Sequence, residues 1–517
     1  MAGIPKARLE SVFSSTSRSR QVQNFHPSYL DNLNFMAGFE IEDSQDIGLN
    51  LFTENPIGSG IVNRIVEGTI GTGLKLESSV CRELLGDDVT DEVITRFQDK
   101  VEAYWNRFAS KPEMCDWYGE HTMGELEAIC LIMGLFGGDC LRYIAIADVG
   151  GKLYLPRIQL ISGRHVSSPN HSDSGNVVAG VERDSKGKDI AYHVEVIKDD
   201  EASATSWVRR EKYSKNGRIQ FKLIKFGEVE TGLVRGRSIF NSVKELIIQA
   251  GRFTEAEVTK AIIQACITLF IESEKDNIED PEDSGIDAIA DSQVQDPDVT
   301  TPDEDEDPDT PITLSPGAAY KLPPGQKAHL AEATAPVAQF MMFMEMLLKI
   351  IGLSVGIPYE VLIECFNSNY SASQAAIQAA ARSWSIWRMR VVARFLTDIY
   401  SQFVECLVRQ GKVEAPGYLD GDPFVRLAWE SAVWHGPATI HIDPVKAVEA
   451  SGKAVNYGFS TRETEAMKLF ENDFWSNVKR LGDEKKALEK NGLVVSEEKP
   501  SADGEKKENE EDKDAEE

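Results

Sequence analysis

The chain has 517 residues, of which 42% are hydrophobic and 8% aromatic, and its formal net charge is −29. This composition is typical of a globular protein with several domains and excludes a chain that is disordered throughout. The negative charge argues against a protein that reads DNA sequence, because tight phosphate contacts need lysine and arginine.

The acidity is concentrated in two segments. Residues 272–309 hold 17 acidic residues and one lysine, a net charge of −16, and residues 497–517 hold 11 acidic residues and four lysines, a net charge of −7. The rest of the chain therefore carries only −6 of the total of −29.

Cysteine usage and hydropathy predict neither a metal site nor a membrane segment. The cysteines are widely spaced, with no CxxC pair, so we expect buried thiols in a reducing cytoplasm. They are Cys81, Cys115, Cys130, Cys140, Cys266, Cys365 and Cys406. The N-terminus has no apolar segment of signal-peptide length. Residues 340–357 are the most apolar window, but two charges interrupt it and it is shorter than the roughly 20 residues of a membrane span.

In chain order, residues 1–50 are expected to form a flexible arm. A helix is predicted to begin at Asn55 and Pro56, because isoleucines follow at helical spacing over residues 57–70. Two glycines then turn the chain into a strand. Residues 89–108 and 122–135 have the periodicity of further amphipathic helices.

Strand-like runs follow, separated by turn sequences such as residues 184–187 and 216–217. The expected strands are residues 140–146, 153–161, 177–183, 190–197 and 219–224. Helices and strands mixed in this way predict an α+β region.

The second half of the chain is predicted to be mainly helical. Helical periodicity returns over residues 237–273, with Gly251 as a candidate break. Residues 276–311 are acidic and contain prolines, which predicts an extended loop. A second helix is expected from Pro336 to about residue 355, ended by the Gly-Ile-Pro run at 356–358.

Three features are expected after that helix. An alanine-rich sequence predicts a long helix over residues 371–409. Residues 444–490 form an interrupted helical region, and a charged tail follows. Small residues at the start of the long helix would let a neighbouring helix approach closely.

Enzyme motifs are missing from the sequence, which has no Walker loop, GxSxG elbow or HExxH pair. Residues 68–75 superficially resemble a phosphate loop, but Leu74 stands where that motif requires lysine, so we interpret them as a turn. The histidines are isolated. The acidic cluster at 303–307 lacks the spacing of a calcium loop and is interpreted as a solvated charge run. We expect no catalytic residue, metal or cofactor.

Seven short motifs carry a family resemblance. They are Asn55-Pro56 with the turn 70–74; Trp105, Phe108, Cys115, Asp116 and Gly119 with Gly138-Asp139; GVERDSKGKDIAYHV at 180–194; RGRSIF at 235–240; LPPG at 322–325; residues 356–362 with Asn369, Tyr370 and Ser371; and Trp434, Gly436 and Pro437 with residues 442–446 and Ala450. In this order they resemble bacteriophage portal proteins of the lambda-like family. Two departures are the Leu-Ile-Lys run at 223–225, where many relatives end in histidine, and the long acidic insert.

The resemblance implies a portal fold, with an α/β wing, two stem helices flanking a clip, a tunnel loop with a long bent helix, and a helical crown. Its expected divisions are a flexible arm at 1–50, the wing at 51–236, the first stem helix at 237–272, the clip with the acidic insert at 273–335, the second stem helix at 336–363, the tunnel loop at 364–371, the long helix and return to the wing at 372–440, the crown at 441–495, and an acidic, disordered tail at 496–517.

The resemblance also implies a role and partners. Portal proteins are rings, dodecameric when assembled, at one capsid vertex of the virion, through which double-stranded DNA is packaged and later ejected. The implied partners are other copies of the chain, the major capsid protein, the terminase large subunit that supplies the ATPase, the head–tail adaptor, and DNA that passes non-specifically. Assembly would take place in the host cytoplasm.

Two sets of site residues follow from the resemblance. Lys349, Asn367, Ser368, Asn369 and Tyr370 are expected to face the DNA channel, where polar loop residues touch phosphate without trapping it. The loop residues have an alternative interpretation as an ordinary turn between helices, and Lys349 as a side chain lying along a subunit contact. Asp303, Glu304, Asp305, Glu306 and Asp307 would lie in the clip, where partners dock.

Two other functions stay open as alternatives to a portal ring. One is a monomeric, capsid-associated nuclease or protease with an unrecognised site. The other is a DNA-binding regulator, which the charge balance and the lack of a reading motif disfavour. The oligomeric mass separates the first alternative from a ring.

Overall fold

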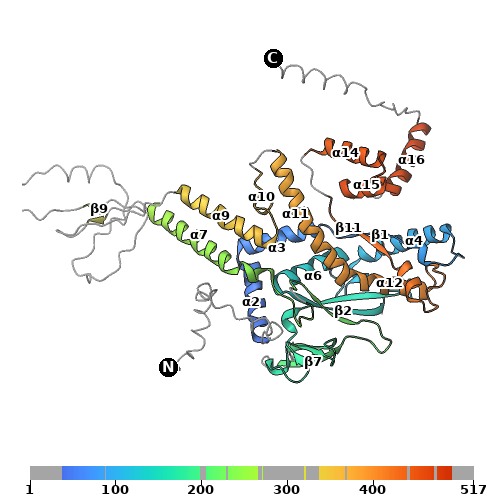
Figure 1. The fold of residues 1–517 in the computed structure, drawn as a ribbon, viewed down its shortest axis with the longest axis horizontal. Coiled ribbons are helices and arrows are strands. Elements are labelled where there is room, and N and C mark those ends of the chain that lie inside the picture. The colour runs from blue at the N-terminus through green and yellow to red at the C-terminus, as the bar shows by residue number, and fades with distance from the viewer. Residues whose placement is uncertain are drawn as a thin grey trace, which may run out of the picture.

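The protein combines helices and sheets in a body from which two long helices project (Figure 1). The computed structural model describes residues 38–87, 89–197, 205–228, 231–265, 270–271, 320–321, 337–366, 370–438, 443–470 and 474–491. Within this part of the chain no helix is both long and apolar enough to cross a membrane. The α+β class predicted from the sequence is confirmed.

The first two helices meet at a capped junction. Helix α2 (Gly38–Glu54) is followed by α3 (Pro56–Thr69). The side chain of Asn55 accepts hydrogen bonds from the backbone N–H groups of Ile57 and Gly58 at 2.9 and 3.2 Å. An asparagine cap before a proline at the first helical position satisfies the free N–H groups of a helix start. The predicted helix start at Asn55 is therefore confirmed.

Helix α2 lies in a segment that the sequence analysis expected to be flexible. Gln45 of α2 is buried and donates from Nε2 to the carbonyl oxygen of Gly137 at 2.9 Å. The expectation of a flexible arm over residues 1–50 thus differs from the structure at residues 38–50. The reason is tertiary packing: α2 is a largely polar helix whose few buried groups contact elements far along the chain.

Three helices follow the strand β1 (Lys75–Ser78) and the short turn η3 (Arg82–Leu84). They are α4 (Asp91–Ala109), α5 (Pro112–Cys115) and α6 (Met123–Gly137). Helix α6 begins with a capping box, in which Thr122 and Glu125 each accept from the other's backbone N–H group. It ends at Gly138 with φ of 87°, where a Cβ atom would lie 2.6 Å from backbone atoms of residues 236 and 237, so glycine is required.

Two antiparallel sheets follow this turn. The three-stranded sheet has the order β3-β2-β8, and the four-stranded sheet has the order β4-β5-β6-β7. Their strands are β2 (Asp139–Asp148), β3 (Tyr154–Ser162), β4 (Val177–Val178), β5 (Val181–Arg183), β6 (Asp189–Ile197), β7 (Thr205–Glu211) and β8 (Phe221–Lys225). The turns η4 (Gly163–His165) and η5 (Pro169–His171) connect the two sheets.

Two features of the four-stranded sheet differ from the prediction. Residues 177–183 form two strands rather than one, because Ala179 and Gly180 adopt φ of 47° and 79°. Strand β7 was not predicted. Its only strongly apolar residues, Trp207 and Val208, are adjacent instead of alternating, and its position at the sheet edge requires no apolar face. The strand forms because it pairs with β6 along its whole length.

The two projecting helices are antiparallel neighbours. After the turn η6 (Ile239–Ser242), helix α7 (Lys244–Ala265) leads away from the body, and α9 (Val337–Val355) returns (Figure 1). The predicted break at Gly251 is wrong, since α7 is continuous through it. Between these helices the structure describes the two-residue strands β9 (Phe270–Ile271) and β10 (Tyr320–Lys321).

A long helix runs back over the sheet. It consists of α11 (Tyr370–Val391), a π-helical turn η7 (Val392–Leu396) and α12 (Thr397–Arg409), which confirms the helix predicted over residues 371–409. The short helix α10 (Tyr359–Leu362) precedes it, and α13 (Pro423–Trp429) follows it.

Strand β11 (Ala432–His435) then returns to pair with β1, joining residues about 360 positions apart. The chain ends in α14 (Pro444–Asn456), α15 (Arg462–Phe470) and α16 (Phe474–Lys490), as the interrupted periodicity predicted. These three helices pack on one another beside the beginning of α11.

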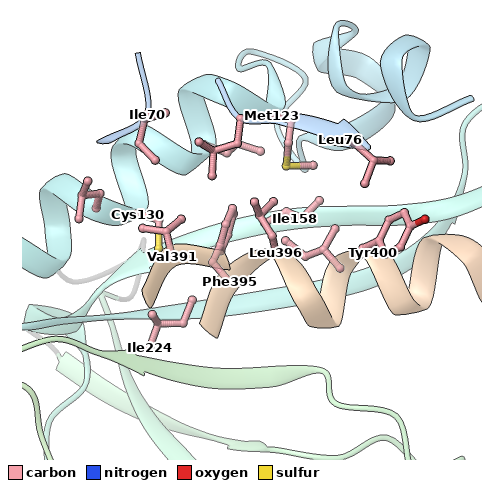
Figure 2. Packing of buried hydrophobic residues seen from close by; sticks show 14 of the residues in the cluster. Ile70, Leu76, Met123, Cys130, Ile158, Ile224, Val391, Phe395, Leu396 and Tyr400 are labelled. Carbon is pink, nitrogen blue, oxygen red and sulfur yellow. The ribbon is translucent and has the colours of Figure 1, made fainter. Parts of the chain in front are cut away.

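The main core lies between α6, the three-stranded sheet and the long helix. Met123 and Cys130 of α6 point toward Phe395 and Leu396 of the long helix, and Ile158 of β3 lies among them (Figure 2). A neighbouring aromatic cluster surrounds Trp105 of α4. Its other members are Phe108, Tyr400, Phe403 and Trp434, with ring centroids 5.1–5.8 Å from that of Trp105. This core fixes where α3, α11 and the projecting helices leave the body.

Candidate DNA channel and subunit surface

Helix α9 packs on α7 and the body through one face. Phe253 of α7 contacts Phe340 and Phe343 of α9, with ring centroids 5.3 and 4.9 Å apart. Further along α9, Leu347 and Ile351 are 7% and 0% exposed. Their spacing of four residues places them on one stripe of the helix. The aromatic end of this stripe contacts α7, and Ile351 belongs to the main core of the body.

The opposite face of α9 is apolar and exposed. Met346 is 58% exposed and Leu353 83% exposed. Large apolar residues continue this face, namely Met341, Met342 and Ile350. Among the described residues nothing covers it. Contiguous exposed apolar surface of this kind marks a site of protein contact.

Lys349 lies on this exposed face and is paired. Its Nζ is 2.7 Å from Oε1 of Glu345, one helical turn earlier, and 5.5 Å from the ring centre of Tyr359. The hydrogen bond to Glu345 raises the pKa of Lys349 above its ordinary value. In each subunit the positive charge expected from Lys349 is therefore accompanied by an adjacent carboxylate, which the sequence interpretation did not include.

The turn after α9 is fixed, but most of the loop residues predicted for the channel lie beyond the described part. Gly356 ends α9 with φ of 77°, and α10 follows. Glu364 has φ of 53° and forms an ion pair with Arg64 of α3 at 2.7 Å. Asn367, Ser368 and Asn369 lie outside the described residues. Tyr370 begins α11, and its backbone alone is described.

The acidic residues predicted for the clip also lie outside the described residues. They are Asp303, Glu304, Asp305, Glu306 and Asp307. Helix α10 contacts both α9, which carries Lys349, and α11, which begins at Tyr370. The other predicted site residues lie outside the described part of the chain.

The second half of α11 is bound to the C-terminal end of α3. Arg388 donates from Nε and Nη2 to the carbonyl oxygens of Thr69 and Gly68, both at 3.0 Å. These carbonyl groups belong to the C-terminal end of α3, where a cation is favourable. Trp384 lies so close to Gly68 that a Cβ atom there would be 2.1 Å from the indole ring. These contacts set the direction in which α11 leaves the body.

A buried arginine supports the π-helical turn. Arg142 of β2 is fully buried, and it donates from Nη1 to the carbonyl oxygen of Phe395 at 2.8 Å and from Nη2 to Asp398 at 2.9 Å. A π-helical turn disturbs the regular hydrogen-bond ladder of a helix. Arg142 supplies a donor at this point and fixes the long helix on the sheet.

A second buried arginine joins two of the sequence motifs. Asp139 and Arg235 form a bidentate ion pair, and Gly236 donates from its backbone to Asp139 at 2.9 Å. The sequence marked Gly138-Asp139 and Arg235-Gly236 as separate motifs, without a signal that they bind each other. In the described part of the chain no three His, Cys, Asp or Glu side chains gather in a way that could hold a metal ion.

The sequence matches a family of known proteins. The family model for phage portal proteins of the lambda family matches residues 50–388. The chain is 25% identical to portal protein B of Escherichia phage lambda over 431 residues, covering 81% of this chain and 79% of the relative. It is 26% identical to the portal protein of Escherichia phage N15 over 435 residues, with the same two coverages.

Among solved structures, the chain aligns with the neck of a native GTA particle at a TM-score of 0.41 and 12% identity, covering 81% of this chain and 92% of that one. It also aligns with the virion of a native gene transfer agent particle at a TM-score of 0.41 and 14% identity, covering 82% and 92%. The match of the family model to well over half of the sequence decides the family. The chain belongs to the lambda family of phage portal proteins.

Proposed function

We propose that this protein works as a closed ring of identical subunits, a dodecamer, at one vertex of the phage capsid. It is a portal for packaging DNA, and it is located in the virion. The observation that supports a ring is the exposed apolar face of α9, because a monomer would leave Met346 and Leu353 in contact with water. Head-to-tail contacts between identical subunits close into rings when the rotation between them permits.

In this ring the segments of the chain take the parts that the family pattern implies. Residues 51–236 form the wing, and α7 and α9 form the stem helices of 237–272 and 336–363. Residues 273–335 form the clip, 364–371 the tunnel loop, 372–440 the long helix and its return to the wing, and 441–495 the crown. The packing of α7 on α9 supports the stem assignment, because the two helices project from the body side by side (Figure 1).

The DNA path follows α9 and the loop after it. Lys349 and residues 367–370 face this path, and DNA is ejected through it as well as packaged. The ion pair of Lys349 with Glu345 suits a conduit, because adjacent opposite charges offer no net site that would hold a phosphate. Substituting Asn369 and Tyr370 with alanine should leave rings intact and reduce packaging. Normal DNA packaging by such rings would show that the loop does not line the DNA path.

The ring meets the major capsid protein at its outer surface, and the terminase large subunit and later the head–tail adaptor at the clip. The acidic segment containing Asp303–Asp307 lies outside the packed core, since unpaired charges are costly to bury. Deleting residues 280–309 should therefore preserve ring formation and change docking of the terminase or adaptor. Loss of folding on deletion would instead make the segment structural.

Electron microscopy and mass photometry of the purified protein test the central proposal. We expect closed rings with a central opening, with capsid proteins present if assembly requires them. A species that stays monomeric at micromolar concentration under both conditions contradicts the ring and would favour the alternative of a capsid-associated enzyme.

A further inference from the structure

A cavity with several arginines lies on the body beside α12. It has a volume of about 570 Å³ and is open to solvent. Its wall comes from α12, α13 and the short hairpin of residues 212–220, which lies between β7 and β8 in the chain. The lining includes Asn216, Arg218, Ser401, Glu405, Arg409 and Arg426.

Three arginines from three different elements converge on one carboxylate in this cavity. Arg218 binds Glu405 through Nε at 3.2 Å and Nη2 at 2.8 Å. Arg409 binds the same carboxylate through Nε at 2.6 Å, and Arg426 lies 3.8 Å from it. A single carboxylate cannot neutralise three guanidinium groups, so positive charge is left in the cavity.

The charged residues around the cavity also have a net positive charge. Three arginines line the cavity against two carboxylates: Arg218, Arg409 and Arg426 against Asp398 and Glu405. Arg142, Lys222 and Glu430 are bound to these groups but do not line the cavity. Glu430 binds Arg426 at 3.4 Å and Tyr418, and Asp398 binds Arg142 and Lys222. A cationic excess of this kind stands out on a chain whose net charge is −29.

Several guanidinium donors face the opening. Each guanidinium has five N–H donors. Within the described part of the chain, the two Nη groups of Arg409 and Nη1 of Arg218 have no side-chain or backbone acceptor and face the cavity that these residues line. The arginines are also pre-positioned: Arg426 lies over the Tyr418 ring at 5.2 Å, and Gln402 fixes the hairpin by donating to Ile219 at 3.0 Å. The cavity is thus a fixed array of donors for oxygen anions.

We infer that this cavity binds carboxylate side chains of an acidic peptide segment from a partner protein. The cavity is large enough for several side chains, and arginines on separate elements can each receive a different carboxylate. The amide of Asn216 and the hydroxyl of Ser401 add neutral hydrogen-bonding groups along the wall. A rigid DNA duplex carries its phosphates on a convex surface and fits a concave cavity poorly, whereas an extended peptide can enter it.

Fluorescence anisotropy with a fluorescein-labelled hexaglutamate peptide tests this proposal on the full chain at low salt. A hexaglutamine peptide of the same length should not bind. Arg409→Gln should weaken hexaglutamate binding about tenfold, the loss expected for one charged hydrogen-bond donor. Arg409 is half exposed, so this variant should fold normally. The matched control is Lys412→Gln, which removes the same charge from an exposed residue just beyond α12 and should change binding less than about twofold.

Glu405→Gln separates a binding site from a purely structural cluster. Removing the competing carboxylate should tighten hexaglutamate binding, whereas a cluster that only holds α12 to the hairpin would gain nothing; circular dichroism verifies that this variant is folded. Equal binding by wild type and Arg409→Gln, or equal losses in Arg409→Gln and Lys412→Gln, overturns the proposal. Displacement of the peptide by duplex DNA or by inorganic phosphate at matched ionic strength, in an Arg409-dependent way, would assign the cavity to phosphate and also overturn it.

Discussion

Asp139 and Arg235 lie 96 residues apart in sequence and bind each other through two hydrogen bonds of 2.7 Å, with side chains only 0% and 3% exposed. Arg235 also donates to the carbonyl oxygens of Val166, Ala179 and Gly163. The pair therefore ties the start of β2, the connection between the two sheets, and the segment that leads into α7. Its position explains why glycine flanks both residues: a Cβ atom on Gly138 or Gly236 would collide with the other segment.

Removing one member of this pair should destabilise the protein strongly. Asp139→Asn leaves the Arg235 charge buried without a counter-charge, and we expect a loss of about 3–5 kcal/mol in the free energy of unfolding. Chemical denaturation measures it. The control is Asp46→Asn, which breaks the solvent-exposed ion pair with Arg164 and should change stability little. Similar small effects from both variants would contradict a structural role for Asp139.

Arg142 should control the π-helical turn. Arg142→Met leaves the carbonyl of Phe395 without its side-chain donor and Asp398 with one cation, so we expect a loss of about 3 kcal/mol and faster hydrogen exchange of the amides at 392–397. Lys222→Met, which keeps the Arg142–Asp398 pair, should cost less.

The pH dependence of the Arg142 variant provides a second check. Burial favours the neutral form of Asp398, but Arg142 and Lys222 beside it hold its pKa below the ordinary value. A lowered pKa contributes stability that is present above the ordinary pKa and is lost as the pH falls. The stability difference between wild type and Arg142→Met should therefore shrink below about pH 4. A difference that stays constant with pH would exclude this charge interaction as the cause.

Glu127 should make the protein less stable as the pH rises. It is fully buried in α6, accepts one hydrogen bond from the backbone of Leu74 at 2.8 Å, and burial raises its pKa to about 8. The folded state keeps this proton up to about pH 8, whereas the unfolded chain loses it near the ordinary value of about 4.3. Ionisation therefore favours the unfolded state progressively between these pH values.

Glu127→Gln retains an oxygen acceptor for Leu74 and cannot ionise. Its stability relative to wild type should increase from pH 5 to about pH 8 and then level off, as measured by thermal unfolding across that range. Glu125→Gln on the same helix is a control in which the pKa of the replaced carboxyl is shifted in the opposite direction. Hydrogen bonds from Thr122 lower the pKa of Glu125, so this variant should lose stability at neutral pH. Parallel curves for wild type and Glu127→Gln would contradict the raised pKa.

The apolar face of α9 should be required for the ring and dispensable for folding. Met346→Glu places a charge on a face that a neighbouring subunit would cover, so rings should be lost while the unfolding midpoint of the monomer changes little. Val196→Glu is the matched control on an exposed apolar residue of the four-stranded sheet, and rings should persist. Mass photometry of both variants gives the result. Intact rings with Met346→Glu would place the subunit contact elsewhere.

The sequence alone determined the elements whose signals are local. The Asn55 cap, the Thr122–Glu125 capping box and the stop at Gly356 each act within a few residues, and the predicted helices appear there. The ion pair between Lys349 and Glu345 could also have been predicted from the sequence, because side chains four residues apart on a helix are neighbours.

Tertiary structure decided the rest. Strand β7 and the β1–β11 pair depend on partners elsewhere in the chain. Helix α2 packs on distant elements through contacts that cannot be predicted from its polar sequence. The hydrogen bond between Asp139 and Arg235 joins positions that are 96 residues apart in the sequence. The hydrogen bond from Arg142 to Phe395 joins positions that are 253 residues apart. Such contacts are favourable only after burial has removed water from both partners. Local periodicity reports which residues prefer a helix or a strand, but it does not report which distant groups will be desolvated together.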